Sequence, residues 1–242
     1  MRIAICDDLP QQLEIINKAT FDYFKSNHES IDIKSFSNAF DLLDHHMKTK
    51  FDLILLDICM PGILGTEVAR ELRMQNDQTE IVFLTTSKEF AIDAFEVNAA
   101  HYLLKPFTQK AFNQAMDRVI QSINHKLSKM VILKGPKGVV RTVDKNLISY
   151  IEADAHTQTV VLNNGTQIEV VQTLSELYQT LQRLSKGQFI IPFKGYIINQ
   201  HAISIIESDG IVLKNSKLIP IPRRTFHLIK QVYFNYMFGE GE

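Results

Sequence analysis

Five polar residues that could do phosphoryl chemistry each follow a short apolar run in the first half of the chain. They are two adjacent acids, Asp7 and Asp8, a third acid, Asp57, a hydroxyl, Thr85, and a base, Lys105. Three carboxylates brought together repel one another, and a hard divalent cation such as Mg²⁺ relieves that repulsion through oxygen ligands. A lysine and a hydroxyl beside them could hold the oxygens of a phosphoryl group. A carboxylate can itself accept that group.

The elements around these residues alternate in a way that brings them to one place. Apolar runs at 2–6, 31–36, 51–57, 81–85 and 101–104 predict strands, and the segments between them and up to 127 predict five helices. Five βα units imply a parallel sheet with helices on both faces. Ligands of such sheets bind at the carboxyl ends of the strands, where all five polar residues fall.

Residues 1–125 resemble the receiver domain of response regulators. The resemblance is carried by Asp7-Asp8 and by three segments in the family's order, LLDICMPGILG (55–65), FLTTS (83–87) and YLLKPF (102–107). It implies a doubly wound, flavodoxin-like sheet of five parallel strands. Thr86 departs from the smaller residue that is usual there, which predicts narrower access to the site.

The resemblance also assigns roles to single residues. It implies that Asp57 is the phosphoacceptor and that Asp8 and Asp57 bind Mg²⁺ through their side chains. Asp7 would assist through water, and the backbone carbonyl of Cys59 would complete the metal ligands.

A second group of roles concerns the switch that follows phosphorylation. Lys105 would contact the phosphoryl group, Thr85 would hydrogen-bond it, and Tyr102 would be the aromatic partner of that movement. The Lys105–Pro106 bond is expected to be cis, an isomer that proline permits at low cost.

The second half changes character. Short segments rich in Val and Ile, separated by turn pairs such as Asn164-Gly165 and Asp209-Gly210, predict an all-β domain. One helix, over about 173–185, is expected within it and opens on a Thr173/Glu176 capping box. No internal repeat is evident. The predicted division is a receiver over 1–125, a linker over 126–130 and a β domain over 131–238.

The charge distribution differs between the halves. Residues 1–125 hold 12 Lys and Arg against 18 Asp and Glu, whereas residues 126–242 hold 14 against 9. A basic second half is compatible with nucleic acid as its partner.

Residues 130–238 resemble the LytTR class of DNA-binding domain, in which β elements and their loops enter the major groove. The matching segments are 147–165, 189–206 and 217–229, but Phe193-Lys194-Gly195 replaces the family's usual His-Arg-Ser. Lysine keeps the positive charge and loses the two-pronged donor of arginine. By position, the expected DNA contacts are His156 or Gln158, Lys194, Asn199, and Arg223 or Arg224. Alternatively, Asn199 shapes a turn and the arginines are a solvated pair at the start of a helix.

These observations predict a phosphorylation-dependent transcription regulator. Its partners would be a sensor histidine kinase, double-stranded DNA and, on activation, a second copy, with Phe90, Ala91, Ala94 and Val97 as a hint of the dimer face. The start of the chain does not look like a signal peptide, and no apolar run is long enough to span a membrane, so a cytoplasmic location is expected.

Other kinds of site and function are less well indicated. Two cysteines without a CxxC motif indicate neither a disulfide framework nor a zinc site. No enzyme is predicted, because an aspartyl phosphatase would carry a DxD motif where Ile58-Cys59 follow Asp57. The alternative function is a phospho-switch whose β domain binds protein or RNA.

Overall fold

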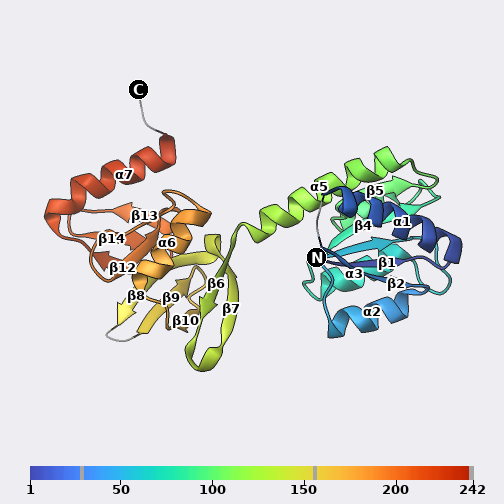
Figure 1. Ribbon diagram of the computed structural model, residues 1–242. Coiled ribbons are helices and arrows are strands. Elements are labelled where there is room, and N and C mark those ends of the chain that lie inside the picture. Colours follow the sequence, from blue (N-terminus) through green and yellow to red (C-terminus); the bar gives the residue numbers. More distant parts are fainter. Residues whose placement is uncertain (28–29, 155–156, 240–242) are drawn as a thin grey trace. The chain divides into compact units, whose positions relative to one another are not determined.

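The computed structural model describes residues 1–27, 30–154 and 157–239, and the chain divides into two compact units, Met1–His125 and Lys126–Glu242. Each unit is described by itself (Figure 1).

Unit 1 is a parallel five-stranded sheet in the order β2-β1-β3-β4-β5, covered by helices on both faces (Figure 1). This order is that of a doubly wound, flavodoxin-like fold, so the predicted fold is confirmed. The strands are β1 (Arg2–Cys6), β2 (Asp32–Phe36), β3 (Leu53–Leu56), β4 (Glu80–Thr85) and β5 (His101–Leu104). The helices are α1 (Pro10–Asn27), α2 (Ala39–Lys48), α3 (Gly65–Met74), α4 (Ala91–Glu96) and α5 (Gln109–Leu127).

Two hydrophobic cores lie on the two faces of this sheet. Helices α2, α3 and α4 contribute Leu42, Val68 and Ala94 to one core, and α1 and α5 contribute Ile16 and Phe112 to the other. All four residues of β3 are buried, as its unbroken apolar run predicts for a central parallel strand. The central strands are thereby held on both sides, which fixes the residues that follow them.

Unit 2 is mostly β, as expected. Its strands are β6 (Met130–Lys134), β7 (Val140–Asp144), β8 (Ile148–Asp154), β9 (Thr157–Leu162), β10 (Gln167–Val170), β11 (Phe189–Ile190), β12 (Tyr196–Asn199), β13 (Ile203–Ile206), β14 (Gly210–Leu213) and β15 (Leu218–Pro220). They form sheets in the orders β10-β9-β8-β12-β11, β13-β14-β15 and β6-β7.

The helices of unit 2 correct one expectation. Besides the predicted α6 (Leu174–Leu184), with its Thr173/Glu176 capping box, there is a second helix, α7 (Phe226–Phe238). The apolar pattern did not predict α7, because its apolar residues lie on all sides of the helix and not on one face. Ile229 is buried, whereas Leu228 and Phe234 are exposed.

The connections correct two more expectations. Helix α5 runs to Leu127 and β6 begins at Met130, so little of 126–130 is left as a separate linker. The hairpin at 209–210 exists, but its turn comes one residue earlier, because Gly210 begins β14. A Cβ at Gly210 would lie 2.5 Å from the Cδ1 atom of Leu218, so the glycine allows a close approach of strands.

Unit 2 consists of two copies of one structural repeat, which inspection of the sequence missed. Each copy is a two-stranded hairpin, a short 3₁₀ turn, a three-stranded meander and a helix. The first copy comprises β6-β7, η2 (Lys145–Leu147), β8-β9-β10 and α6, and the second comprises β11-β12, η3 (Gln200–Ala202), β13-β14-β15 and α7. Only a short segment of the two repeats is similar in sequence: residues 148–154 (ISYIEAD) match residues 203–209 (ISIIESD).

Details of the hydrogen bonding match in the two copies. Asp144 and Asn199 cap their 3₁₀ turns by accepting from the N–H two residues later. A β-bulge falls between Ile148 and Tyr150 in β8, and the corresponding one falls between Ile203 and Ile205 in β13. Two backbone hydrogen bonds also match. The bond from Asn163 N to Leu147 O in the first repeat corresponds to that from Lys214 N to Ala202 O in the second, both 2.8 Å. The bond from Leu162 N to Thr166 O corresponds to that from Leu213 N to Lys217 O, both 2.9 Å.

Candidate functional site

The carboxyl end of β3 places Asp57 in a buried position at the centre of the sheet edge. Its N–H donates to the carbonyl of Cys6 at 2.9 Å, which ties it to the end of β1. Helix α3 starts directly over this residue, and a Cβ at Gly65 would lie 2.2 Å from the Asp57 carbonyl oxygen. Only glycine fits there, so Gly65 of the LLDICMPGILG segment serves close packing at the site.

Lys105 joins two of the predicted acids. Its Nζ donates to Oδ1 of Asp57 at 2.7 Å and also forms an ion pair with Asp7. All three side chains are buried, and Asp7 accepts a further bond from the N–H of Leu9 at 3.0 Å. The bond between Lys105 and Pro106 is cis, as predicted. One ammonium therefore faces two carboxylates in a place with little water.

Burial and neighbouring charges shift two pKa values here. Burial raises the pKa of Asp57, the carboxylate of Asp7 adds to the rise, and the Lys105 ammonium opposes it. Burial, followed by the charges of Asp7 and Asp57, raises the pKa of the Cys6 thiol to about 12. The site therefore carries an excess of negative charge that the lysine offsets only in part.

The predicted switch residues lie beside this cluster. Thr85 is buried, its Oγ1 lies 3.7 Å from Sγ of Cys59, and it accepts from the N–H of Ser87 at 3.3 Å. The hydroxyl of Tyr102 donates to the carbonyl of Ser87 at 2.7 Å. Ser87 thus links the two residues, a role that the sequence did not indicate. Thr86 is exposed at the same rim.

The metal ligands predicted from the sequence are brought together only in part. Asp7 and Asp57 are joined through Lys105, while Asp8 is half-buried beside them. Within residues 1–27, 30–154 and 157–239, no three His, Cys, Asp or Glu side chains are grouped so that they could hold a metal ion. The oxygen donors and the excess negative charge nevertheless fit a hard divalent cation.

The residues singled out as a dimer face are mostly core residues. Ala94 and Val97 are buried, and Phe90 packs against the same core. Only Ala91 of the four is exposed. The exposed apolar side chains of α4 are instead Ile92, at 75%, and Phe95, at 84%.

In unit 2, most of the predicted DNA contacts are accessible. Lys194, Arg223 and Arg224 are exposed, and Gln158 in β9 is half-buried. His156 lies outside the described residues. Beside Lys194, the hydroxyl of Tyr196 donates to Glu152, which also lies 3.5 Å from Nζ of Lys217. Nothing in the sequence signalled this polar cluster except an acid in an otherwise apolar strand.

Asn199 does not fit a direct DNA contact. It is 0% exposed, donates to the carbonyl of Ile148 at 2.8 Å and accepts from the N–H of His201 at 3.0 Å. Its amide is therefore used within the fold, where it caps η3. Its burial does not favour the prediction that it reads a base and supports the alternative that it shapes a turn.

Comparisons with known proteins identify both units. The model of the response regulator receiver domain matches residues 3–117, and that of the LytTr DNA-binding domain matches residues 138–233. The sensory transduction protein LytT of Oceanobacillus iheyensis is 31% identical over 204 residues, covering 78% of this chain and 81% of that protein. The chain belongs to the LytT/LytR family of response regulators.

Similarity extends to further proteins. The sensory transduction protein LytR of Staphylococcus epidermidis is 27% identical over 221 residues, covering 87% of this chain and 85% of that protein. Among solved structures, the chemotaxis protein CheY4 of Vibrio cholerae is 25% identical with a TM-score of 0.43, covering 49% of this chain and 97% of that one.

This response regulator is therefore a two-component transcriptional regulator that combines a receiver with a DNA-binding domain. DNA, rather than protein or RNA, is the ligand that the second match favours. None of its described helices combines the length and apolar character needed to cross a bilayer.

Proposed function

We propose that the regulator accepts a phosphoryl group on Asp57 from a phosphohistidine of a sensor kinase. A carboxylate oxygen of Asp57 forms the new P–O bond while the P–N bond to the histidine breaks, and the histidine nitrogen keeps the electron pair and takes up a proton. The observation that carries the proposal is Nζ of Lys105 at 2.7 Å from Oδ1 of Asp57. This cation is already positioned to stabilise charge on the transferring group.

Asp8 and Asp57, with Asp7 through water and the carbonyl of Cys59, would hold Mg²⁺. Receiver domains typically bind this ion, and two buried carboxylates that share one ammonium retain negative charge that a divalent cation neutralises. When bound, it supplies further charge stabilisation to the phosphoryl oxygens.

Phosphorylation then changes the bonding of the switch residues. The phosphoryl group brings a charge of roughly −2, which Lys105 and the hydroxyl of Thr85 can bind. Moving Thr85 inward breaks its bond with the N–H of Ser87, whose carbonyl holds Tyr102. Ser87 can then move together with the carbonyl that Tyr102 binds, so Tyr102 reorients and the face formed by α4, β5 and α5 changes shape.

The activated regulator binds promoter DNA as a dimer. Exposed Ile92 and Phe95 on α4 are apolar side chains that a second copy could cover. The accessible candidates for DNA contact are Lys194, Arg223 and Arg224, with Gln158 and His156 as the loop candidates. Arginine can read guanine or hold a phosphate, and lysine can hold a phosphate. This activity places the regulator in the cytoplasm.

The test is a selection of bound sequences from randomised duplex DNA, with protein treated with Mg²⁺ and a small-molecule phosphodonor, beside Asp57→Ala. We expect the wild type to take up one phosphoryl group and to enrich a paired motif, and the variant to do neither. Phosphate on Asp57→Ala would refute the acceptor assignment. Failure of both proteins to enrich any sequence at low salt would refute the DNA contacts.

A further inference from the structure

The two repeats of unit 2 are joined by a pairing of strands, which uses the hairpin of the second repeat and the meander of the first. Strand β12 of the second repeat pairs with β8 of the first, so the second hairpin completes the sheet of the first meander. The first hairpin and the second meander have no such partner: among the described residues β7 pairs only with β6, and β13 only with β14. Both are exposed edge strands, with Val140 at 62% and Ile205 at 50%. Open edges of this kind can add another strand.

We propose that two copies of this chain associate head to tail, with β7 of one copy pairing antiparallel with β13 of the other. The register follows from the pairing within the chain, where Tyr196 lies opposite Glu152 and Ile198 lies opposite Tyr150. The repeat relates Tyr196 and Ile198 to Arg141 and Val143. It relates Glu152 and Tyr150 to Glu207 and Ile205. The same pairing between copies therefore sets Arg141 opposite Glu207.

Charge complementarity supports this register. Within the chain, Tyr196 donates a hydrogen bond to Glu152 at the corresponding position. Arg141 is a stronger donor and Glu207 is an acceptor of opposite charge. Both are exposed, and the described part of the chain supplies neither with an ion pair. The proposed interface gives each one a partner.

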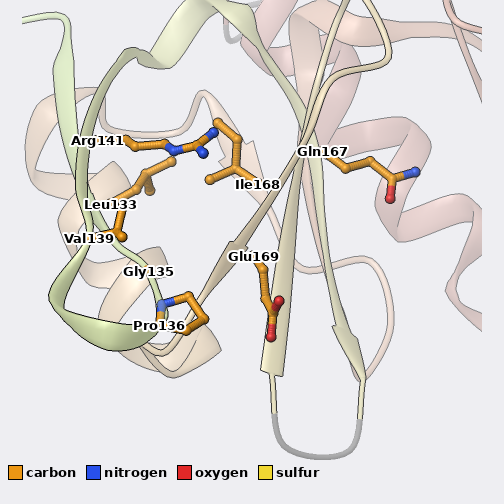
Figure 2. Close-up of a pocket in the computed structure, with 8 residues that line it drawn as sticks. All are labelled: Leu133, Gly135, Pro136, Val139, Arg141, Gln167, Ile168 and Glu169. Atoms are coloured by element: carbon orange, nitrogen blue, oxygen red, sulfur yellow. The ribbon is translucent and has the colours of Figure 1, made fainter.

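A cavity beside the hairpin supports the same arrangement. Figure 2 shows Arg141 reaching from the β6-β7 hairpin toward Ile168 of β10, beside a cavity of about 210 Å³ that Leu133 and Val139 also line. This cavity corresponds in position to a place in the second repeat that side chains fill.

The second repeat shows what fills that place. Tyr196 and Ile219, the counterparts of Arg141 and Ile168, share a core with Tyr150 and Val161, which come from the preceding repeat. Within unit 2 no repeat precedes the first one, so no counterparts of Tyr150 and Val161 fill its cavity. The counterpart of Tyr150 in a second copy is Ile205, whose exposed side chain would meet the apolar part of the cavity wall, Leu133, Val139 and Ile168; Arg141, Gln167 and Glu169 are among the residues that line the rest. The interface thus buries Ile205 as well as pairing the strands.

Such an interface joins unlike surfaces, so each added copy leaves one β7 edge and one β13 edge free. It also holds successive DNA-binding units in the same orientation along their axis. It therefore differs from the receiver dimer proposed above and does not depend on it.

The test is sedimentation velocity of the unphosphorylated full-length chain over a concentration series, with Arg141→Glu, with Glu207→Arg and with an equimolar mixture of the two. Each variant alone brings like charges together and should associate about tenfold more weakly than the wild type. In the mixture, the glutamate introduced in one copy lies opposite the arginine introduced in the other, so association should be regained.

Lys137→Glu is the matched control, because it makes the same charge change at the tip of the hairpin, outside β7. It should associate like the wild type. A wild-type chain that stays monomeric, or a mixture that associates no better than its two components, would overturn the proposal. Dimerisation through the receiver would be insensitive to all of these substitutions, so the mixture would then associate no better than either variant alone.

Discussion

The phosphoacceptor site of the receiver and the DNA-contact residues of the second unit are fixed to very different degrees. Asp7, Asp57 and Thr85 are buried, and Lys105 is bonded to both acids. Lys194, in a turn, and Arg223, at the start of a short 3₁₀ helix, are by contrast exposed. Transfer of a phosphoryl group requires charges held in place before the reaction, because their reorganisation would add to the barrier. Binding a DNA backbone requires positive charge that can reach phosphates, and long flexible side chains provide it.

Removing Lys105 is the strongest test of the fixed site after loss of Asp57 itself. We expect Lys105→Ala to slow phosphorylation by a small-molecule donor roughly 100-fold, because one preset cation is lost from the transferring group. Lys110→Ala, an exposed lysine on α5, serves as the control and should leave the rate unchanged. The measurement is the initial rate of phosphoprotein formation. A normal rate in Lys105→Ala would mean that the buried ion pairs serve only the fold.

The pH dependence of phosphorylation probes the same charges. Only the carboxylate form of Asp57 accepts the phosphoryl group, and its pKa is raised mainly by burial. The rate should therefore be highest well above that pKa and fall about tenfold per pH unit below it.

Lys105→Ala should move the descending limb to higher pH, because the hydrogen bond and charge of the lysine lower the pKa of Asp57. Rates of both proteins measured from about pH 8 to about pH 4 test this shift. Superimposed profiles would contradict the electrostatic account.

Asn199 sharpens the comparison, because it is a predicted DNA contact that is nevertheless buried and hydrogen-bonded, like the residues of the receiver site. Asn199→Ala leaves the Ile148 carbonyl and the His201 N–H unpaired. We expect it to lower the free energy of unfolding of unit 2 by about 1–3 kcal/mol, as measured by urea denaturation. Asn199→Asp keeps the acceptor for His201 but buries a carboxylate against the Ile148 carbonyl, so it should lose at least as much. Unchanged stability with weakened DNA binding would restore the original prediction of a base contact.

Exposed basic residues should have the smallest effects. Lys194→Ala and Arg224→Ala should each leave stability within about 0.5 kcal/mol of the wild type. Each should weaken DNA binding and reduce by about one the slope of log affinity against log salt concentration. Lys186→Ala, which removes another exposed lysine of unit 2 outside the predicted contacts, is the control. An unchanged salt slope would place the DNA elsewhere on the unit.

The sequence predicted the receiver more completely than the output unit for a physical reason. Four of the five strands of unit 1, all except β2, are apolar runs that end in a residue with a distinct chemistry, so position and role are visible together. In unit 2 the strands are short and the repeat is held by backbone bonds, which many side chains permit. Asn199 shows why a residue's role could not be predicted, because an amide that caps a buried turn looks the same in sequence as one that reads adenine. Helix α7 shows why a whole helix could not be predicted, because its apolar residues lie on every side.

The two cysteines of the receiver give it a built-in labelling position. Thiol reagents react with the thiolate, and the Cys6 thiol, with its pKa raised to about 12, is buried and almost wholly protonated at neutral pH. Cys59 is exposed two residues from Asp57. An alkylating fluorophore added to the unmodified protein would thus attach at one place, beside the phosphoacceptor and Thr85. Its emission could report phosphorylation in real time without any engineered cysteine.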